Sequence, residues 1–472
     1  MRSPLLFVMF TAAAPLFAQQ AWTLEQCVQR AEERNLAIQR AQYDRDASFQ
    51  DERAAKWGLF PDLNAAATHG YNWGQTIDRY TNEFATDRVR TNNFWLGSSW
   101  TLYGGMARQN QWKQTKLNMA SAEEALAAAR IDVRSRVVSF FMQMLSAEER
   151  IKAATNTVER TREQVVLTEA LVQAGRTAPV ELLDLRAQQA REEFDLVTAE
   201  NQYQQARLQL AQLLQLDLAE MEAFSITAPA LSAFEPQEPS ITVEQVMQRV
   251  RESHPSYKRT ELDVQSAEKG VEISRAAGIP SLQFSANVAS GFSGLNEVPV
   301  GEPIYGTPSL VGYTSGGEDV FVPNVSYATE VKGFGDQLKD NVNYSTAWTL
   351  NVPLFNNMRN RTGVQQARIR YERARLQQTD IEQQLRLTVQ QAIADQRAAY
   401  RQYMAASNAV DAAQESMSYA KERFEQGAVT ALELSTAKTN LNRSMADMIT
   451  ARYNYVLATK SLEILQGMPL TL

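Results

Sequence analysis

The chain contains the same sequence unit twice. The segment TLEQCVQRAEERN (23–35) aligns with TVEQVMQRVRESH (242–254), 219 positions later, and six residues are identical. Further along, the offset becomes 252 positions, which places Gly175 on Gly427. The second half therefore carries 33 extra residues (252 − 219). Because an internal repeat implies that one supersecondary unit occurs in each copy, we predict two halves of the same fold.

Each half is predicted to fold in the order helix, strand, strand, helix, helix. The first repeat covers 19–224 and the second covers 241–472, and the proline-rich segment 225–240 links them. In the first repeat we expect strands at 61–73 and 94–103 and helices at 23–57, 105–173 and 179–217. In the second we expect strands at 280–292 and 344–355 and helices at 242–276, 357–425 and 430–466. The two strands of the second half are separated by a long polar loop rich in Gly and Pro.

The predicted strands have one apolar and one polar face. In IPSLQFSANVASG (279–291), Leu282 and Phe284 alternate with Ser281, Gln283 and Ser285. Successive strand side chains point to opposite faces, so this pattern is typical of a strand and not of a helix.

The predicted helices 105–173 and 357–425 are unusually long. They contain no Pro, and each has one Gly near its start. At 1.5 Å per residue, each would be a rod of roughly 100 Å. Their narrow apolar seams among many Ala and Gln residues predict coiled-coil-like packing of neighbouring helices.

The N-terminal segment MRSPLLFVMFTAAAPLFAQQ has the features of a secretory signal peptide, and we expect residues 1–18 to be removed. A buried N-terminal helix is the alternative. After Ala18 no apolar run of about 18 residues occurs, so a membrane crossing would have to use strands. Strands in lipid must form a closed barrel, and the smallest barrels need about eight. Four strands per chain therefore predict that several chains share one barrel.

Composition excludes several classes of function. One Cys and two His residues make a disulfide framework impossible within the chain and disfavour a His/Cys metal site. A net charge of −7 without a basic block gives no support for nucleic-acid binding. No catalytic motif is present, and we expect no enzymatic activity, cofactor or metal.

Taken together, the duplicated plan, the corners Phe60-Pro61 and Ile279-Pro280, and the segment LEILQG (462–467) resemble the TolC-type outer-membrane efflux proteins. This resemblance implies a mainly α-helical homotrimer with a 12-strand barrel in the outer membrane and an α-helical tunnel across the periplasm. It also implies docking to a periplasmic adaptor (membrane fusion) protein and an inner-membrane pump. The protein would be a passive duct for efflux or type I secretion.

The resemblance places the periplasmic gate near the two helical turns. The matching acidic residues are Glu181, Asp184 and Glu433, with Arg176 as a possible partner in a seal. Thr436 occupies a position where a second acid is common in the family. A structural alternative is compatible with the gate: Glu433 suits a capping box with Thr430, and acids near a helix start suit the macrodipole.

The resemblance also implies that a periplasmic adaptor docks at the tips of the helical turns. These tips are formed by Gly175, Thr177, Ala178, Pro179, Gly427, Ala428, Val429 and Thr430. The lipid-facing strand residues are expected to be Leu282, Phe284, Trp100, Trp348, Leu350 and Val352.

Two other functions compete with the duct. A diffusion porin would carry all its strands in one chain and would lack the long helices. A periplasmic helical adaptor or scaffold would explain the helices, but not the amphipathic strands.

Overall fold

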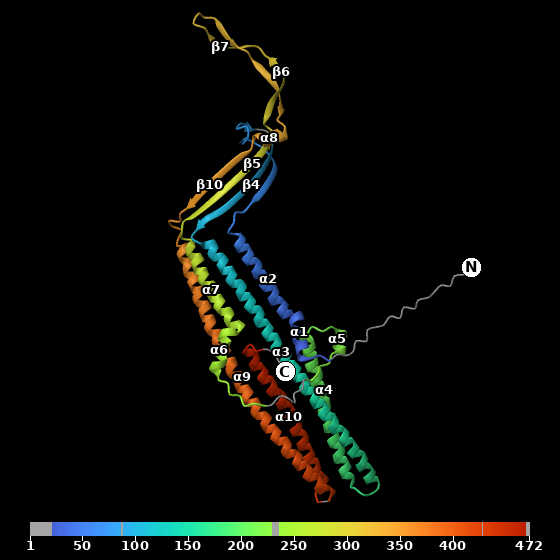
Figure 1. Cartoon of the computed structure of the whole chain (residues 1–472). Helices are drawn as coiled ribbons and strands as arrows, with labels where there is room; N and C mark the ends of the chain where they lie inside the picture. Colours follow the sequence, from blue (N-terminus) through green and yellow to red (C-terminus); the bar gives the residue numbers. More distant parts are fainter. Residues whose placement is uncertain (1–20, 86–87, 229–235, 427, 469–472) are drawn as a thin grey trace, which may run out of the picture. The chain divides into compact units, whose positions relative to one another are not determined.

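A computed structural model describes residues 21–85, 88–228, 236–426 and 428–468 (Figure 1). The chain divides into two compact units, which are described separately. One unit contains residues 1–50, 116–266 and 372–472, and the other contains residues 51–115 and 267–371. The predicted signal peptide, residues 1–18, lies outside the described residues.

The two halves have matching helices. Both α3 (Ala107–Gln173) and α9 (Arg359–Glu425) contain 67 residues, and α4 (Pro179–Leu213) and α10 (Ala431–Leu465) contain 35 each. The shorter helices are α1 (Leu24–Arg34), α2 (Leu36–Trp57), α5 (Leu218–Ala223), α6 (Val243–Ser253), α7 (Pro255–Ala276) and α8 (Phe334–Asp340). No helix among the described residues is both long enough and apolar enough to cross a membrane.

The predicted first helix of each half is broken in two. Asn35 separates α1 from α2, and its Oδ1 accepts a hydrogen bond from the Ala37 amide at 2.9 Å. At the equivalent position, His254 separates α6 from α7, and its Nδ1 accepts from the Ser256 amide at 3.3 Å. Pro255 also lacks an amide proton for α6 to continue. The prediction of single helices at 23–57 and 242–276 was therefore wrong, because a local side-chain cap competes with helix continuation.

The unit formed by residues 51–115 and 267–371 contains a four-stranded antiparallel sheet. Its strand order is β1 (Asn64–Asn72), β4 (Val89–Gly104), β5 (Ser281–Ser293) and β10 (Asn343–Asn351). A β-bulge between Thr101 and Tyr103 shifts the register at the end of β4. In the first half of the sequence β1 pairs with β4, and in the second half β5 pairs with β10. Because β4 also pairs with β5, the duplicated halves meet in the middle of the sheet.

The long second connection is not the irregular loop that the sequence predicted. It forms β6 (Glu297–Tyr305) with β9 (Val325–Val331), and β7 (Ser309–Tyr313) with β8 (Asp319–Val322), followed by α8. The shorter connection also holds a small pair, β2 (Thr76–Ile77) and β3 (Phe84–Ala85). The frequent Gly and Pro residues suggested a loop, but strands that pair with each other satisfy the hydrogen bonds of their backbone N–H and C=O groups even in such a segment.

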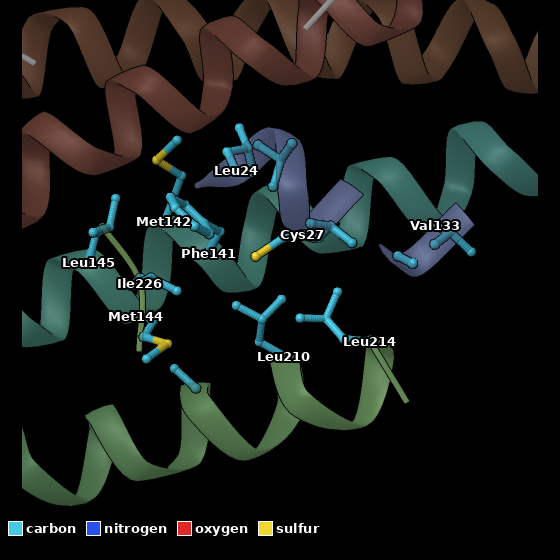
Figure 2. Packing of buried hydrophobic residues seen from close by; sticks show 14 of the residues in the cluster. Leu24, Cys27, Val133, Phe141, Met142, Met144, Leu145, Leu210, Leu214 and Ile226 are labelled. Atoms are coloured by element: carbon cyan, nitrogen blue, oxygen red, sulfur yellow. The ribbon is translucent and has the colours of Figure 1, made fainter. Parts of the chain in front are cut away.

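The largest hydrophobic core lies in the unit formed by residues 1–50, 116–266 and 372–472, where it joins α1, α3 and α4. Figure 2 shows Phe141 and Met144 of α3 in one cluster with Cys27 of α1 and Leu210 of α4. All four side chains are fully buried. Burial raises the pKa of the Cys27 thiol to about 12, so this residue packs as a small apolar side chain. A second, smaller cluster centres on Met247 and its neighbours on α6.

Candidate functional site

The turn between α3 and α4 forms the first helical tip. Its chain reversal is a Schellman motif: the Gly175 amide donates to the Val172 carbonyl, and the Arg176 amide donates to the Leu171 carbonyl, both at 2.9 Å. Gly175 has φ of +69°, a left-handed conformation that glycine adopts without steric cost. Pro179 then starts α4 at its first turn.

The turn between α9 and α10 forms the second tip and has the same 6→1 hydrogen bond. The Ala428 amide donates to the Arg423 carbonyl at 2.8 Å, which corresponds to the Arg176–Leu171 bond at an offset of 252. Gly427, predicted to lie at this tip, falls outside the described residues. Thr430 caps α10, and its Oγ1 accepts a hydrogen bond from the Glu433 amide at 3.3 Å.

The predicted gate carboxylates lie at these helix starts. Glu181 and Glu433 are in the first turns of α4 and α10, and Asp184 follows one turn later; all three are exposed. Negative charge is favourable at a helix N-terminus, so the capping role is compatible with this geometry. Arg176 is also exposed, and the ion pairs of the described residues do not join it to Glu181 or Asp184.

The other predicted tip residues are small or only partly covered. Ala178, Pro179, Ala428 and Thr430 are exposed, whereas Thr177 and Val429 are half-buried. The tips therefore present backbone and short side chains, to which another helical hairpin could approach closely.

Within the described ranges, no group of three or more His, Cys, Asp or Glu side chains is arranged to hold a metal ion.

A buried lysine links the two helical hairpins, and sequence reasoning missed it. Lys438 of α10 is only 7% exposed, and its Nζ donates to Thr161 Oγ1 of α3 at 2.7 Å and to Gln164 Oε1 at 3.3 Å. Burial lowers the pKa of Lys438, while the nearby Glu192 carboxylate opposes that shift. A second bond between the hairpins joins Ser435 of α10 to Gln188 of α4.

The repeat contains a signal that could have indicated this link. The first-half counterpart of Lys438 is Arg186, which forms an exposed ion pair with Glu169 of its own hairpin at 3.1 Å. In the second half the position of Glu169 is occupied by Lys421, which has the same charge as Lys438. Since like charges repel, Lys438 has no ion pair available at that position. It instead turns toward α3.

Strand pairing places the apolar residues of four strands on one face of the sheet. Trp100, Phe284 and Trp348 stand opposite one another on β4, β5 and β10, and the rings of Phe284 and Trp348 are 4.8 Å apart. Directly opposed residues share a face. The same face carries Leu282, Leu350, Val288, Leu96, Phe94, Phe292, Tyr71 and Ala286.

The opposite face of the sheet is mainly polar. It carries Ser281, Gln283, Ser285, Asn287, Ser99, Asn93, Thr68, Ser345 and Thr349, together with Trp95. Five of the six predicted lipid-facing residues therefore share the apolar face. Val352 does not belong to a strand, because β10 ends at Asn351, and the prediction of a strand up to residue 355 was too long.

The two outer strands of the sheet have free edges. In the described part of the chain, β1 pairs only with β4, and β10 pairs only with β5. Strand directions alternate across the sheet, so β10 of one copy could pair with β1 of another in the antiparallel sense. An unpaired edge of nine residues is a template for association with a further chain.

Similar folds occur in channels of bacterial outer membranes. The outer membrane protein VceC of Vibrio cholerae matches with a TM-score of 0.73 and 15% identity, over 95% of this chain and 97% of VceC. The MtrE outer membrane channel of Neisseria gonorrhoeae matches with a TM-score of 0.71 and 17% identity, over 94% and 89% of the two chains. At these identities the likeness establishes the fold.

A model of the outer membrane efflux protein family matches residues 27–215 and 246–467. The chain therefore belongs to the outer membrane efflux protein family, whose location is the outer membrane. The family prediction made from the duplicated sequence is confirmed.

Two curated relatives match over shorter segments. The cobalt-zinc-cadmium resistance protein CzcC of Cupriavidus metallidurans is 31% identical over 156 residues, which is 33% of this chain and 36% of CzcC. The outer membrane protein TolC of Escherichia coli is 26% identical over 162 residues, or 33% of each chain. The matched segments thus span about a third of these relatives' length.

Proposed function

We propose that three copies of this chain form an outer-membrane duct, to which each copy contributes four strands of a closed 12-strand barrel. The observation that carries this proposal is the four-stranded sheet with one apolar face, one polar face and two free edges. A spanning sheet must satisfy every backbone group, so β1 and β10 need partners from other copies. Three copies would supply twelve strands, an even number within the range of known barrels.

The apolar face would contact lipid and the polar face would line the duct. Trp100, Phe284 and Trp348 form an aromatic row near the end of the strands that connects to the long helices. Aromatic residues gather where a barrel wall meets the membrane interface. The row would therefore mark the periplasmic side of the membrane.

The helical tips would form the gate and the docking surface for a periplasmic adaptor, which connects the duct to an inner-membrane pump. Three copies of Glu181, Asp184 and Glu433 would place nine carboxylates around a narrow opening, and such a ring favours cations. The tip residues Gly175, Thr177, Ala178, Pro179, Gly427, Ala428, Val429 and Thr430 would contact the adaptor. The duct itself would be passive and without catalysis. Because the relative CzcC is named for resistance to cobalt, zinc and cadmium, divalent cations are a candidate cargo of this duct.

Single-channel conductance in a planar bilayer tests this function. We expect detergent-extracted protein to give a small, cation-preferring conductance, because the acidic tips would restrict the duct. A large and steady conductance would instead indicate an open porin. Protein that needs no detergent and conducts no current would support a periplasmic scaffold. The mass of the detergent-solubilised assembly, measured by native mass spectrometry, would separately test for three copies.

A further inference from the structure

Two arginines lie on aromatic rings at one end of the apolar face. The guanidinium carbon of Arg88 is 5.0 Å from the centroid of the Tyr71 ring, and that of Arg90 is 4.6 Å from the centroid of the Phe292 ring. Both arginine side chains are exposed. A cation–π contact holds a guanidinium over a ring without neutralising its charge. Two positive charges thus lie at one end of the face that carries the apolar strand residues, where Asn92 and His69 also lie.

Helix α8 packs against the same face of the sheet, beside the Phe292 ring. The Phe334 ring of α8 is 5.4 Å from the Phe292 ring and 6.2 Å from the Phe94 ring. Ser290 of β5 donates a hydrogen bond to the Leu338 carbonyl of α8 at 2.6 Å. Phe292 is consequently only 5% exposed, so the ring beneath Arg90 is held in place. The position of Arg90 is therefore built into the fold.

The arginines lie one membrane thickness from the aromatic row at the other end of the strands. Arg90 is ten residues from Trp100 along β4, which corresponds to about 33 Å of strand at 3.3 Å per residue. A strand tilt of about 40° reduces this to about 25 Å along the membrane normal, the height of the apolar band in outer-membrane barrels. Because the long helices lie at the Trp100 end, Arg88 and Arg90 would lie in the outer leaflet's headgroup layer.

The two charges lack a counterion in the described part of the chain. No ion pair there involves Arg88 or Arg90, although exposed pairs are common on the helices. The nearby carboxylate of Asp78 is buried and accepts hydrogen bonds from Ser293, Tyr80 and Thr81. Arg88 immediately precedes β4 and Arg90 is its second residue, and the rings beneath the two guanidinium groups belong to β1 and β5, the strands that flank β4. Like charges on one end of the sheet repel, so an anion at this end would be favourable.

We propose that Arg88 and Arg90 bind a phosphate monoester on a glycolipid of the outer leaflet, of the lipid A type. This proposal rests on the proposed function, because it requires the apolar face to contact lipid. A phosphate monoester carries a charge of about −1.5 to −2 at pH 7, which matches two guanidinium groups better than the single charge of a phosphodiester. The planar guanidinium also binds phosphate oxygens in pairs. The lipid's acyl chains would lie along Phe94, Leu96 and Val288.

Native mass spectrometry of the detergent-solubilised protein with added lipid A tests the proposal. We expect the Arg88→Gln, Arg90→Gln double variant to bind lipid A at least about tenfold more weakly than the wild type. The Arg88→Lys, Arg90→Lys variant should keep part of the affinity. The matched control, Arg191→Gln with Arg401→Gln, removes two exposed charges from α4 and α9 and should bind like the wild type. Phosphatidylglycerol, a phosphodiester, should bind more weakly than lipid A.

Three results would overturn the proposal. Equal lipid A affinity of the wild type and the Gln double variant would show that the arginines do not form the site. Displacement of lipid A by millimolar inorganic phosphate would assign the arginines to a free anion. Conductance of the same wild-type preparation separates the two proposals. If the protein conducts but its lipid A binding does not depend on the arginines, only the lipid site is overturned. If the protein does not conduct, both the duct and the lipid site are overturned.

Discussion

The Nζ of Lys438 on α10 donates a hydrogen bond to Thr161 Oγ1 on α3 at 2.7 Å, and both residues are buried. The bond joins two hairpins that come from different halves of the duplicated sequence. A buried ammonium group is costly unless it is hydrogen-bonded, so this contact constrains how the hairpins pack near their tips. Glu192 lies close enough to influence the lysine, and one of its buried oxygens has no hydrogen-bond partner among the described residues.

We expect Lys438→Ala to loosen the packing of α10 against α3. The change leaves the buried Thr161 hydroxyl without its partner, and an unsatisfied buried polar group costs about 1–3 kcal/mol, whereas Gln164 is exposed to water. Hydrogen exchange along α10 measures the local opening free energy. The control is Arg186→Ala at the equivalent position, where the exposed pair with Glu169 is worth less than about 1 kcal/mol. Equal protection of α10 in both variants would contradict the assignment.

His254 should make the stability of the α6–α7 junction depend on pH. Burial lowers the pKa of His254, and its Nδ1 must be unprotonated to accept from the Ser256 amide. Below about pH 6.5, His254 is protonated in the unfolded chain but stays neutral in the folded chain. The free energy of unfolding therefore falls as the pH decreases toward the lowered pKa of His254 in the folded state. We expect the melting temperature to drop between pH 7.5 and pH 5.

The matched variant for this test is His254→Asn, which installs the residue found at the equivalent position of the first half. Asn35 caps α2 through a side-chain oxygen that does not titrate. The variant should keep the cap, worth about 1 kcal/mol, and lose part of the pH dependence. If the wild type and the variant melt in parallel across this pH range, His254 does not control the junction.

The acidic tips should determine ion preference. We expect the Glu181→Gln, Asp184→Asn, Glu433→Gln triple variant to lose most of its preference for cations, measured by reversal potential in a salt gradient. The control substitutes three exposed acids further from the tips: Glu193→Gln, Asp195→Asn and Glu415→Gln. An unchanged reversal potential in the tip variant would leave these carboxylates as helix caps only.

Two adjacent residues on β5 test which face meets lipid. Ala286 lies on the apolar face between Ser98 and Thr346, and Ser285 lies on the polar face between Ser99 and Ala347. Both sites have small neighbours, so crowding is similar. Arginine on a lipid face costs about 2–4 kcal/mol near the bilayer midplane. We expect Ala286→Arg to reduce assembly in the outer membrane and Ser285→Arg to assemble normally. The reverse result would show that the faces are exchanged.

The sequence by itself determined the features that depend on local periodicity and on the repeat. The lengths of α3 and α9 follow from uninterrupted helical patterns without Pro, and the two faces of β5 follow from its alternation. These signals are reliable because helix and strand geometries impose their own spacing on apolar residues. Comparison of the two halves also located both helical tips. The breaks at Asn35 and His254 were missed, although Pro255 marked one of them.

Only the tertiary structure decided which residues meet across long separations in the chain. Thr161 and Lys438 are 277 positions apart, and Arg90 and Phe292 come from strands of different halves. The strands within residues 297–331 were equally hidden, because they pair with each other and not with the main sheet. Such contacts depend on strand register and helix packing, which are set by the whole fold, whereas periodicity reports only how each segment is built.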